Sequence, residues 1–297
     1  GSITGSGTLT STGSFEMKNG SVDAVLAGAG IALNKTTSGT ATLSGANTYT
    51  GATTVNAGVL NVIGSLANNG SNKVSIYADA TGAAKLTRRV LGTGLPSYAG
   101  IGSAIAGGDL GTKADIMAGA ASGAADVSMG WRTRTDTEKT QVGGGLISEI
   151  LSLDGIHAHG SATDNFLLQM AYDTGELSRI WGLSESDAIA QQRLYLGALV
   201  DSEWVCAVEG NFGGTATWKG DMLVSTVAAG DLAVELGWYG VDSTTHVAWA
   251  VLDHNSCFAV SAVPEPPSLI TCGIGAASLL AYTWRKRRRT VQDIKTS

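Results

Sequence analysis

The chain has 297 residues, of which 43% are hydrophobic and only 15% are charged, and its formal net charge at pH 7 is −6. Residues 1–263 hold 13 Lys and Arg against 23 Asp and Glu, whereas residues 264–297 hold 6 against 2. Because phosphate binding needs clustered cations, the acidic part of the chain argues against nucleic acid as a partner. The 41 glycines indicate a β protein rich in small residues rather than a compact cytoplasmic enzyme.

Residues 1–72 consist of short alternating runs bounded by Gly or Asn, a pattern typical of short strands and turns. The segment GTLTSTG at residues 7–13 recurs in similar form as GTATLSG at residues 39–45. Repeated units of this kind bury one face only against their neighbours in the stack. We therefore expect residues 1–72 to form a solenoid.

Residues 39–62, GTATLSGANTYTGATTVNAGVLNV, resemble the autotransporter-associated β-strand repeat. The matching positions are Gly45, Asn47, Tyr49, Gly51, Thr54, Val55, Gly58 and Leu60. The resemblance implies a right-handed parallel β-helix. Glycines permit corners with positive φ, and an Asn at a turn tolerates the left-handed region. The alternative, a disordered Gly/Thr linker, is disfavoured by the regular alternation of apolar positions.

The pattern changes after residue 72. Residues 73–125 are rich in Gly and Ala and are predicted to connect two domains, with one helix near residues 114–121. From residue 126, Val127, Met129 and Trp131 alternate with polar or small residues, which predicts a strand with one apolar face. Further strands are expected at residues 146–153, 166–172, 194–200, 204–208, 223–227, 232–239, 247–252 and 258–263.

The spacing of these strands predicts that residues 126–262 form an antiparallel β-sandwich or jelly-roll-like domain. Residues 201–203 and 242–245 are expected to close hairpins. The segment Ser-Glu-Ser-Asp at residues 184–187 is a capping-box pattern, which predicts one short helix before the sheet continues. The expected fold is therefore all-β, with a parallel solenoid followed by an antiparallel domain.

The segment 263–297 has three parts. Val263, Pro264, Glu265, Pro266 and Pro267 precede an uncharged run at residues 268–284, and a basic cluster follows it. At about 1.5 Å per helical residue the uncharged run spans roughly 25 Å, slightly less than a hydrocarbon core of about 30 Å. It is predicted to form a single transmembrane helix. By the positive-inside rule, the stop-transfer cluster stays in the cytoplasm; it consists of Arg285, Lys286, Arg287, Arg288 and Arg289.

The prolines remove backbone donors and favour extended geometry before them, so the motif presents an extended substrate to a protease. The Pro264-Glu265-Pro266 motif, the apolar helix and the basic end resemble the PEP-CTERM sorting signal of Gram-negative exported proteins. The resemblance implies a transient stage in the inner membrane, processing by an exosortase, and delivery to the cell surface or extracellular matrix. An ordinary membrane anchor is the alternative. We also expect the parent protein to carry a signal peptide before Gly1.

Candidate chemical groups are sparse. His157 and His159, with Asp154 and Asp164 nearby, have a spacing that fits two metal ligands, but a solvated loop pair is the favoured interpretation. The three cysteines include Cys206 and Cys257 in predicted strands and Cys272 in the apolar run. The sequence leaves open whether Cys206 and Cys257 form a disulfide.

Four acids, Asp201, Glu203, Glu209 and Asp221, could supply the carboxylate pair of a glycosidase, but in a chain with 25 acids this spacing is weak evidence. The tryptophans are expected in the core or on sheet faces, with a carbohydrate groove as the alternative. We predict no catalytic residue, no metal and no cofactor. The sequence therefore favours an exported structural protein, and the competing hypothesis is an exported protein that binds or cleaves extracellular polysaccharide.

Overall fold

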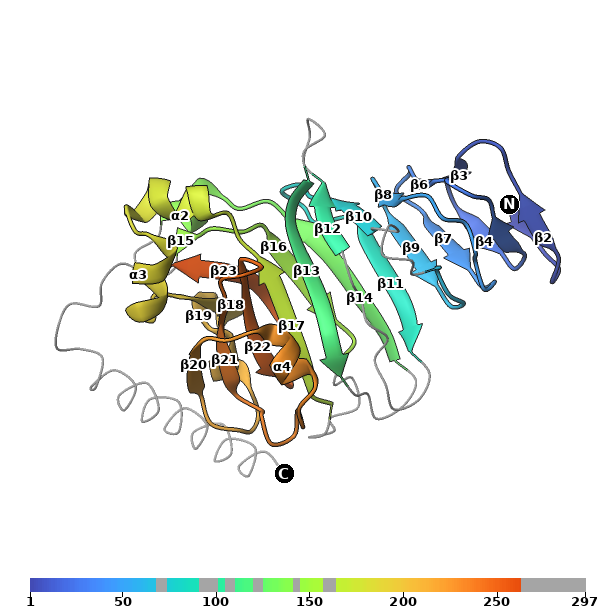
Figure 1. The fold of residues 1–297 in the computed structure, drawn as a ribbon. Coiled ribbons are helices and arrows are strands. Elements are labelled where there is room, and N and C mark those ends of the chain that lie inside the picture. The colour runs from blue at the N-terminus through green and yellow to red at the C-terminus, as the bar shows by residue number, and fades with distance from the viewer. Residues whose placement is uncertain are drawn as a thin grey trace, which may run out of the picture. The chain divides into compact units, whose positions relative to one another are not determined.

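The computed structural model describes residues 1–67, 74–90, 101–104, 110–119, 125–140, 145–156 and 164–262. The chain divides into two compact units, residues 1–262 and 263–297, and all described residues belong to the first. Strands dominate this unit, and they form two long sheets and a short third one (Figure 1). The predicted all-β class is confirmed for the described residues.

The two long sheets contain most of the strands. The first sheet has the order β1 (Ser2–Ile3), β4 (Gly20–Val22), β7 (Thr40–Leu43), β9 (Val59–Val62), β11 (Lys85–Val90), β14 (Ala125–Arg132), β16 (Ile150–Asp154), β23 (Ser256–Ala262), β18 (Leu194–Val200) and β19 (Glu203–Cys206), and β15 (Gly145–Leu146) also pairs with β23. The second sheet has the order β20 (Thr217–Asp221), β21 (Trp238–Asp242), β22 (Val247–Leu252), β17 (Phe166–Ala171), β13 (Leu110–Gly119), β12 (Ile101–Ala104), β10 (Val74–Tyr77), β8 (Thr53–Val55), β6 (Leu33–Lys35) and β3 (Phe15–Met17). The third sheet pairs β2 (Thr8–Thr10) with β5 (Val25–Ala27).

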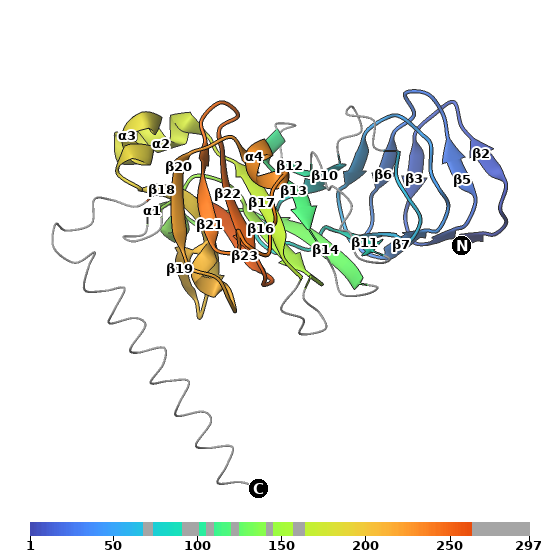
Figure 2. The same ribbon diagram turned by 60° about the horizontal axis from the view of Figure 1, so that its bottom comes forward.

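Within residues 1–90 the strands of each sheet pair in parallel. Ser2 of β1 pairs with Ser21 of β4, and Leu33 of β6 pairs with Thr53 of β8. Figure 2 shows these strands, in blue, side by side. The chain thus returns to the same sheet after each coil and adds the next strand beside the last one. We call residues 1–90 the coil stack.

The recurrence of residues 7–13 at residues 39–45 does not follow the pairing of the strands. Strand β2, from the first segment, lies in the third sheet and pairs with β5, whereas β7, from the second segment, lies in the first sheet. Small residues flank strands at different corners of the stack. Similar Gly and Thr segments therefore occur at positions that are not equivalent in space.

The pairing changes from parallel to antiparallel at β11 and β12. Strand β11 is parallel to β9 and antiparallel to β14, and β12 is parallel to β10 and antiparallel to β13. The region 73–125, which we expected to connect two domains, therefore contributes strands to both sheets. One apolar core runs through the unit, because it includes Leu60 of the coil stack and Phe258 of β23.

Several predicted elements are confirmed. Strands β18 and β22 have the predicted bounds, and Val127, Met129 and Trp131 of β14 are all buried. The β18–β19 hairpin is closed by Asp201 and Ser202, whose φ angles of 50° and 70° are left-handed. The β21–β22 hairpin is also present.

Three predicted elements are wrong, and the strand expected at residues 146–153 is divided between β15 and β16. Of the strand expected at residues 232–239, only residues 238 and 239 are extended, in β21, because Asp231 accepts hydrogen bonds from the Ala233 and Glu235 N–H groups and holds a turn there. The helix expected near residues 114–121 is strand β13, because Ala114 and Ile116 alternate with their neighbours and face the core. The strand expected at residues 223–227 is helix α4 (Val224–Ala228). Its two buried side chains, Val224 and Val227, lie three residues apart and pack in a cluster with Trp249, so packing overrides the strand preference of valine.

The helix predicted after Ser184 is α3 (Glu185–Ala190), whose Ser184 Oγ accepts a hydrogen bond from the Asp187 N–H at 3.1 Å. Helix α2 (Thr174–Trp181) was not predicted, although its ends carry recognisable signals. Asp173 Oδ1 accepts from the Gly175 N–H at 2.7 Å, and Gly182 ends the helix with a φ of 61°. The short α1 (Asp136–Thr140) and the 3-10 turn η1 (Ala207–Gly210) were not predicted either.

Candidate functional site

The residues assigned to the repeat line the interior of the coil stack. Along the chain from Ala41, every second side chain is buried, and this inward row includes Leu43, Gly45, Asn47 and Tyr49. The residues between them are half-buried or exposed. A strand-like alternation therefore places one polar amide, Asn47, among apolar neighbours.

Asn47 links three levels of the stack. Its side chain is buried, and its Oδ1 accepts a hydrogen bond from the Leu26 N–H at 3.0 Å. Its Nδ2 donates to the carbonyl oxygens of Gly45 at 2.9 Å and Ser65 at 3.0 Å. These three bonds use both ends of the amide, so Asn47 satisfies backbone groups that turn inward at this corner.

Tyr49 fills the interior beside this corner. Its ring is buried and lies edge-on to Phe15, with the ring centroids 6.1 Å apart. Its hydroxyl is 2.6 Å from Thr53 Oγ1. Burial raises the pKa of Tyr49 to about 12, so the phenol stays protonated and acts as a packing group.

The repeat glycines lie where successive coils approach closely. A Cβ atom on Gly45 would lie 2.5 Å from the Ala24 carbonyl oxygen, and one on Gly51 would lie 2.4 Å from the Ile31 carbonyl carbon. Gly58 also has a φ of 65°, which a residue with a Cβ rarely adopts. The repeat positions are thus explained by stacking and not by chemistry.

The predicted sorting residues Val263, Pro264, Glu265 and Pro266 lie outside the described residues, as do Arg285, Lys286, Arg287, Arg288 and Arg289. The predicted transmembrane run and Cys272 lie there too. In the described part of the chain, no helix has the length and apolar character needed to span a bilayer.

The histidine pair His157 and His159 also falls outside the described residues, whereas Asp154 ends β16 and Asp164 is buried. Among the residues that the structure describes, no group of three or more His, Cys, Asp and Glu side chains is placed to hold a metal ion.

The four candidate carboxylates lie on separate elements near the edge strands of the two sheets. Asp201 is in the β18–β19 turn and Glu203 in β19, while Glu209 is in η1 and Asp221 ends β20. Glu209 keeps contact with solvent, yet desolvation by its neighbours raises its pKa. Asp221 accepts a hydrogen bond from the Ser243 N–H at 2.9 Å, which assigns it a role in holding the β21–β22 loop.

The two described cysteines do not form a disulfide. Cys206 of β19 pairs with Gly197 of β18, whereas Cys257 belongs to β23 on the other side of β18. Two strand spacings of about 4.8 Å place their Cα atoms farther apart than the roughly 4.4–6.8 Å of a disulfide. Both thiols are free, and burial raises the pKa of Cys206.

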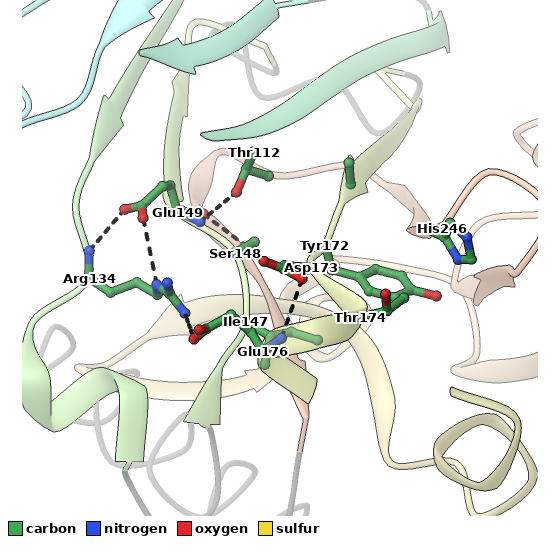
Figure 3. Close-up of a pocket in the computed structure, with 11 residues that line it drawn as sticks. Thr112, Arg134, Ile147, Ser148, Glu149, Tyr172, Asp173, Thr174, Glu176 and His246 are labelled. Atoms are coloured by element: carbon green, nitrogen blue, oxygen red, sulfur yellow. Dashed lines mark hydrogen bonds and ion pairs between the residues drawn. The ribbon is translucent and has the colours of Figure 1, made fainter. Parts of the chain in front are cut away.

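A cavity of about 400 Å³ lies at the ends of several strands and beside α2. Its lining comes from segments far apart in the sequence (Figure 3). The lining residues are Thr112, Arg134, Ile147, Ser148, Glu149, Ala171, Tyr172, Asp173, Thr174, Glu176 and His246. We call it the Arg134 cavity, and none of the residues singled out from the sequence line it.

Arg134 is held by the loop between β15 and β16. Its main-chain N–H donates to Glu149 Oε2 at 3.1 Å, and its Nη1 donates to the Leu146 carbonyl oxygen at 2.6 Å. A carboxylate oxygen of Glu149 lies 3.7 Å from Nε of Arg134, and one of Glu176 lies 3.6 Å from Nη1. Only 12% of the Arg134 side chain is exposed, so these two acids compensate a largely buried cation.

Tyr172 and His246 form another wall of the cavity, apart from Arg134 and Glu149 (Figure 3). The Tyr172 hydroxyl donates to Glu185 Oε1, and His246 Nδ1 is 2.8 Å from the same oxygen. Burial, followed by the hydrogen bond to Glu185, raises the pKa of Tyr172. Glu185 of α3 thus contacts the polar atoms of both rings.

A bidentate ion pair between Arg132 and Glu138 lies near this region and predicts acid sensitivity. Arg132 donates to both Glu138 oxygens at 2.8 and 2.9 Å, and together with hydrogen bonds from Thr135 this lowers the pKa of Glu138 to about 2. Because the pKa of Glu138 is lower in the folded than in the unfolded protein, the ion pair stabilises the fold fully above the unfolded-state pKa of about 4.3. This stabilisation is lost as the pH falls toward 2.

We therefore expect Glu138→Gln to lower the free energy of unfolding at pH 7 by about 1–2 kcal/mol, after discounting for partial exposure. The variant should also lose part of the pH dependence of stability between about pH 5 and pH 2. Urea unfolding across this range measures both effects, and Glu203→Gln at an exposed site is the control. A variant with an unchanged pH dependence would contradict the assignment.

Comparison with known proteins identifies one family model. The passenger-associated-transport-repeat model matches residues 33–62, which begin at the first residue of β6 and end at the last residue of β9. The match confirms the autotransporter-associated repeat and indicates an exported protein of the autotransporter passenger type. No curated protein and no solved structure matches the chain significantly.

Proposed function

We propose that this chain is a structural protein of the cell surface or extracellular matrix, with its coil stack serving as a stiff stalk. The single observation that carries the proposal is the passenger-associated repeat at residues 33–62, which coincides with strands paired in parallel. In this proposal the coil stack is a parallel β-helix. Each coil contacts only its neighbours and is joined to them by the hydrogen bonds of parallel strands. A stack joined in this way along its whole length suits a load-bearing role.

The proposed sorting route uses residues 263–289. Val263, Pro264, Glu265 and Pro266 form the processing motif, and an exosortase-type enzyme of the inner membrane is the processing partner. The apolar run holds the motif near the bilayer for a time, and the basic cluster Arg285–Arg289 prevents complete translocation. The sequence pattern of this segment supports the route.

The competing function is binding or cleavage of an extracellular polysaccharide. The Arg134 cavity is the specific observation that favours its binding form. Under the structural proposal the chain carries out no catalysis itself, and the chemistry of sorting belongs to the processing enzyme.

The sorting proposal predicts that replacing Pro264, Glu265 and Pro266 together by alanine retains the protein in the inner membrane of its host. Alanines remove the proline-imposed extended geometry and the Glu265 side chain, so the motif that the proposed processing enzyme reads is lost. Cell fractionation measures the location, and mass spectrometry of peptides after residue 272 measures processing. Pro267→Ala, next to the motif, is the matched control and should leave display unchanged. Unaltered surface display of the triple variant would refute the sorting route.

A further inference from the structure

We propose that the Arg134 cavity binds one neutral sugar unit of a polysaccharide. This inference is independent of the sorting route, since it rests on the geometry of residues 112–246 alone. At about 400 Å³ the cavity falls in the range of roughly 300–1,000 Å³ that is typical of small-molecule sites. A single water occupies about 30 Å³, so the volume is far larger than one buried water needs.

The donors of Arg134 are only partly used. Among the described residues, its guanidinium makes one hydrogen bond, from Nη1 to the Leu146 carbonyl oxygen, besides its ion pairs. Its Nε is buried and has no hydrogen-bond partner. A buried donor without an acceptor costs about 1–3 kcal/mol. Because Nε is sealed from the cavity, the donors that remain for a ligand oxygen are those on the Nη atoms.

The charge balance of the cavity selects a neutral ligand. Glu149 and Glu176 both lie within 4 Å of the Arg134 guanidinium, so an anion approaching the arginine would also meet two carboxylates. A third lining carboxylate, Asp173, is engaged by the N–H groups at the start of α2, and Glu176 is also paired with Arg179, so an added cation would meet Arg134 and acids that already have partners. A polyol avoids both penalties because each hydroxyl accepts a hydrogen bond from the guanidinium and donates one to a carboxylate.

The remaining lining offers both apolar and polar contacts to a sugar ring. Ile147, Ala171 and the ring of Tyr172 supply apolar surface for the C–H groups, and Thr174 supplies a hydroxyl. Glu185 engages Nδ1 of His246, so the other ring nitrogen remains for a ligand. Because Glu185 also anchors Tyr172, both rings are held in place before a ligand arrives, which lowers the cost of ordering them.

The test is calorimetric titration of the full chain in a detergent that has no sugar headgroup. The probes are glucose, galactose, mannose and N-acetylglucosamine with their disaccharides, and glucuronate and glucosamine are the charged counterparts. We expect saturable binding of at least one neutral sugar and weaker binding of the charged forms. Arg134→Lys keeps the charge and loses the planar donors, so it should weaken binding about tenfold or more.

Arg179→Lys is the matched control, because Arg179 also pairs with Glu176 but does not line the cavity. It should leave the affinity unchanged. Should Arg134→Lys fail to fold, Thr174→Leu fills the cavity instead, with Thr226→Leu on the exposed face of α4 as its control. Absence of binding by every neutral sugar overturns the proposal. Tighter binding of glucuronate, or an affinity unaffected by the cavity variants, overturns it as well.

Discussion

Asn47→Ala is expected to lower the free energy of unfolding of the coil stack by about 3 kcal/mol. The substitution removes the acceptor of the buried Leu26 N–H and both donors to the carbonyl oxygens of Gly45 and Ser65. The two carbonyls also accept backbone N–H groups, whereas the Leu26 N–H would lose the Asn47 acceptor. The loss of this acceptor therefore accounts for most of the expected effect, since a buried donor cannot turn to water.

The measurement is urea unfolding together with hydrogen exchange of the Leu26 amide, which should exchange faster in the variant because the coils open locally. Asn47→Asp keeps the acceptor of the Leu26 N–H, but it buries an ionised carboxylate beside the carbonyl oxygens of Gly45 and Ser65, so it should also destabilise the stack at pH 7. Asn56→Ala removes an exposed asparagine of the same repeat and should change stability by less than about 0.5 kcal/mol. If Asn47→Ala and Asn56→Ala have equal stability, Asn47 does not hold the coils together.

The coil stack was predictable because its signals are local. Alternation of apolar side chains and glycine at the corners occur within short segments, and Asn47 and Gly51 could be recognised from such segments. The length of one coil was not predictable, because it depends on which strands pair. Gly and Thr recur at several corners of one coil, so sequence similarity alone does not identify the spatial repeat.

Errors in the antiparallel part arose where tertiary contacts decide the local structure. The segment of α4 reads as a strand because it is rich in valine, but Asp242 Oδ2 accepts a hydrogen bond from the Val224 N–H at 3.1 Å and fixes the start of the helix. That partner lies far along the chain, in β21. No short window around Val224 contains this information.

The Arg134 cavity was missed for a similar reason. Arg134, Glu149, Glu176 and His246 belong to four segments that meet only after the two sheets have formed. Each of them alone resembles an ordinary surface charge in a chain with 25 acids. Their shared features, a largely buried guanidinium and carboxylates within 4 Å of it, are properties of the folded chain.

Gly51→Ala is expected to destabilise the coil stack by about 3 kcal/mol, through steric conflict alone. Gly51 does not have a positive φ, so its backbone conformation accepts a Cβ atom. That atom would lie 2.4 Å from the carbonyl carbon and oxygen of Ile31, which belong to the previous coil. Because backbone atoms cannot rotate away, the two coils must separate, and the hydrogen bond from the Gly51 N–H to the Ile31 oxygen at 2.9 Å is strained with them.

Gly13→Ala is the matched control, because a Cβ atom there meets no atom within 4 Å and the backbone again lacks a positive φ. Alanine at that site should leave stability unchanged or raise it by about 0.5 kcal/mol, since it reduces the freedom of the unfolded chain. The two substitutions are chemically identical. If thermal and urea unfolding show a loss of stability for Gly51→Ala but none for Gly13→Ala, the close approach of the coils at Gly51 is the cause. Equal effects of the two variants would mean that the coils are not in contact at Gly51, and the stacked register of residues 1–90 would have to be rejected.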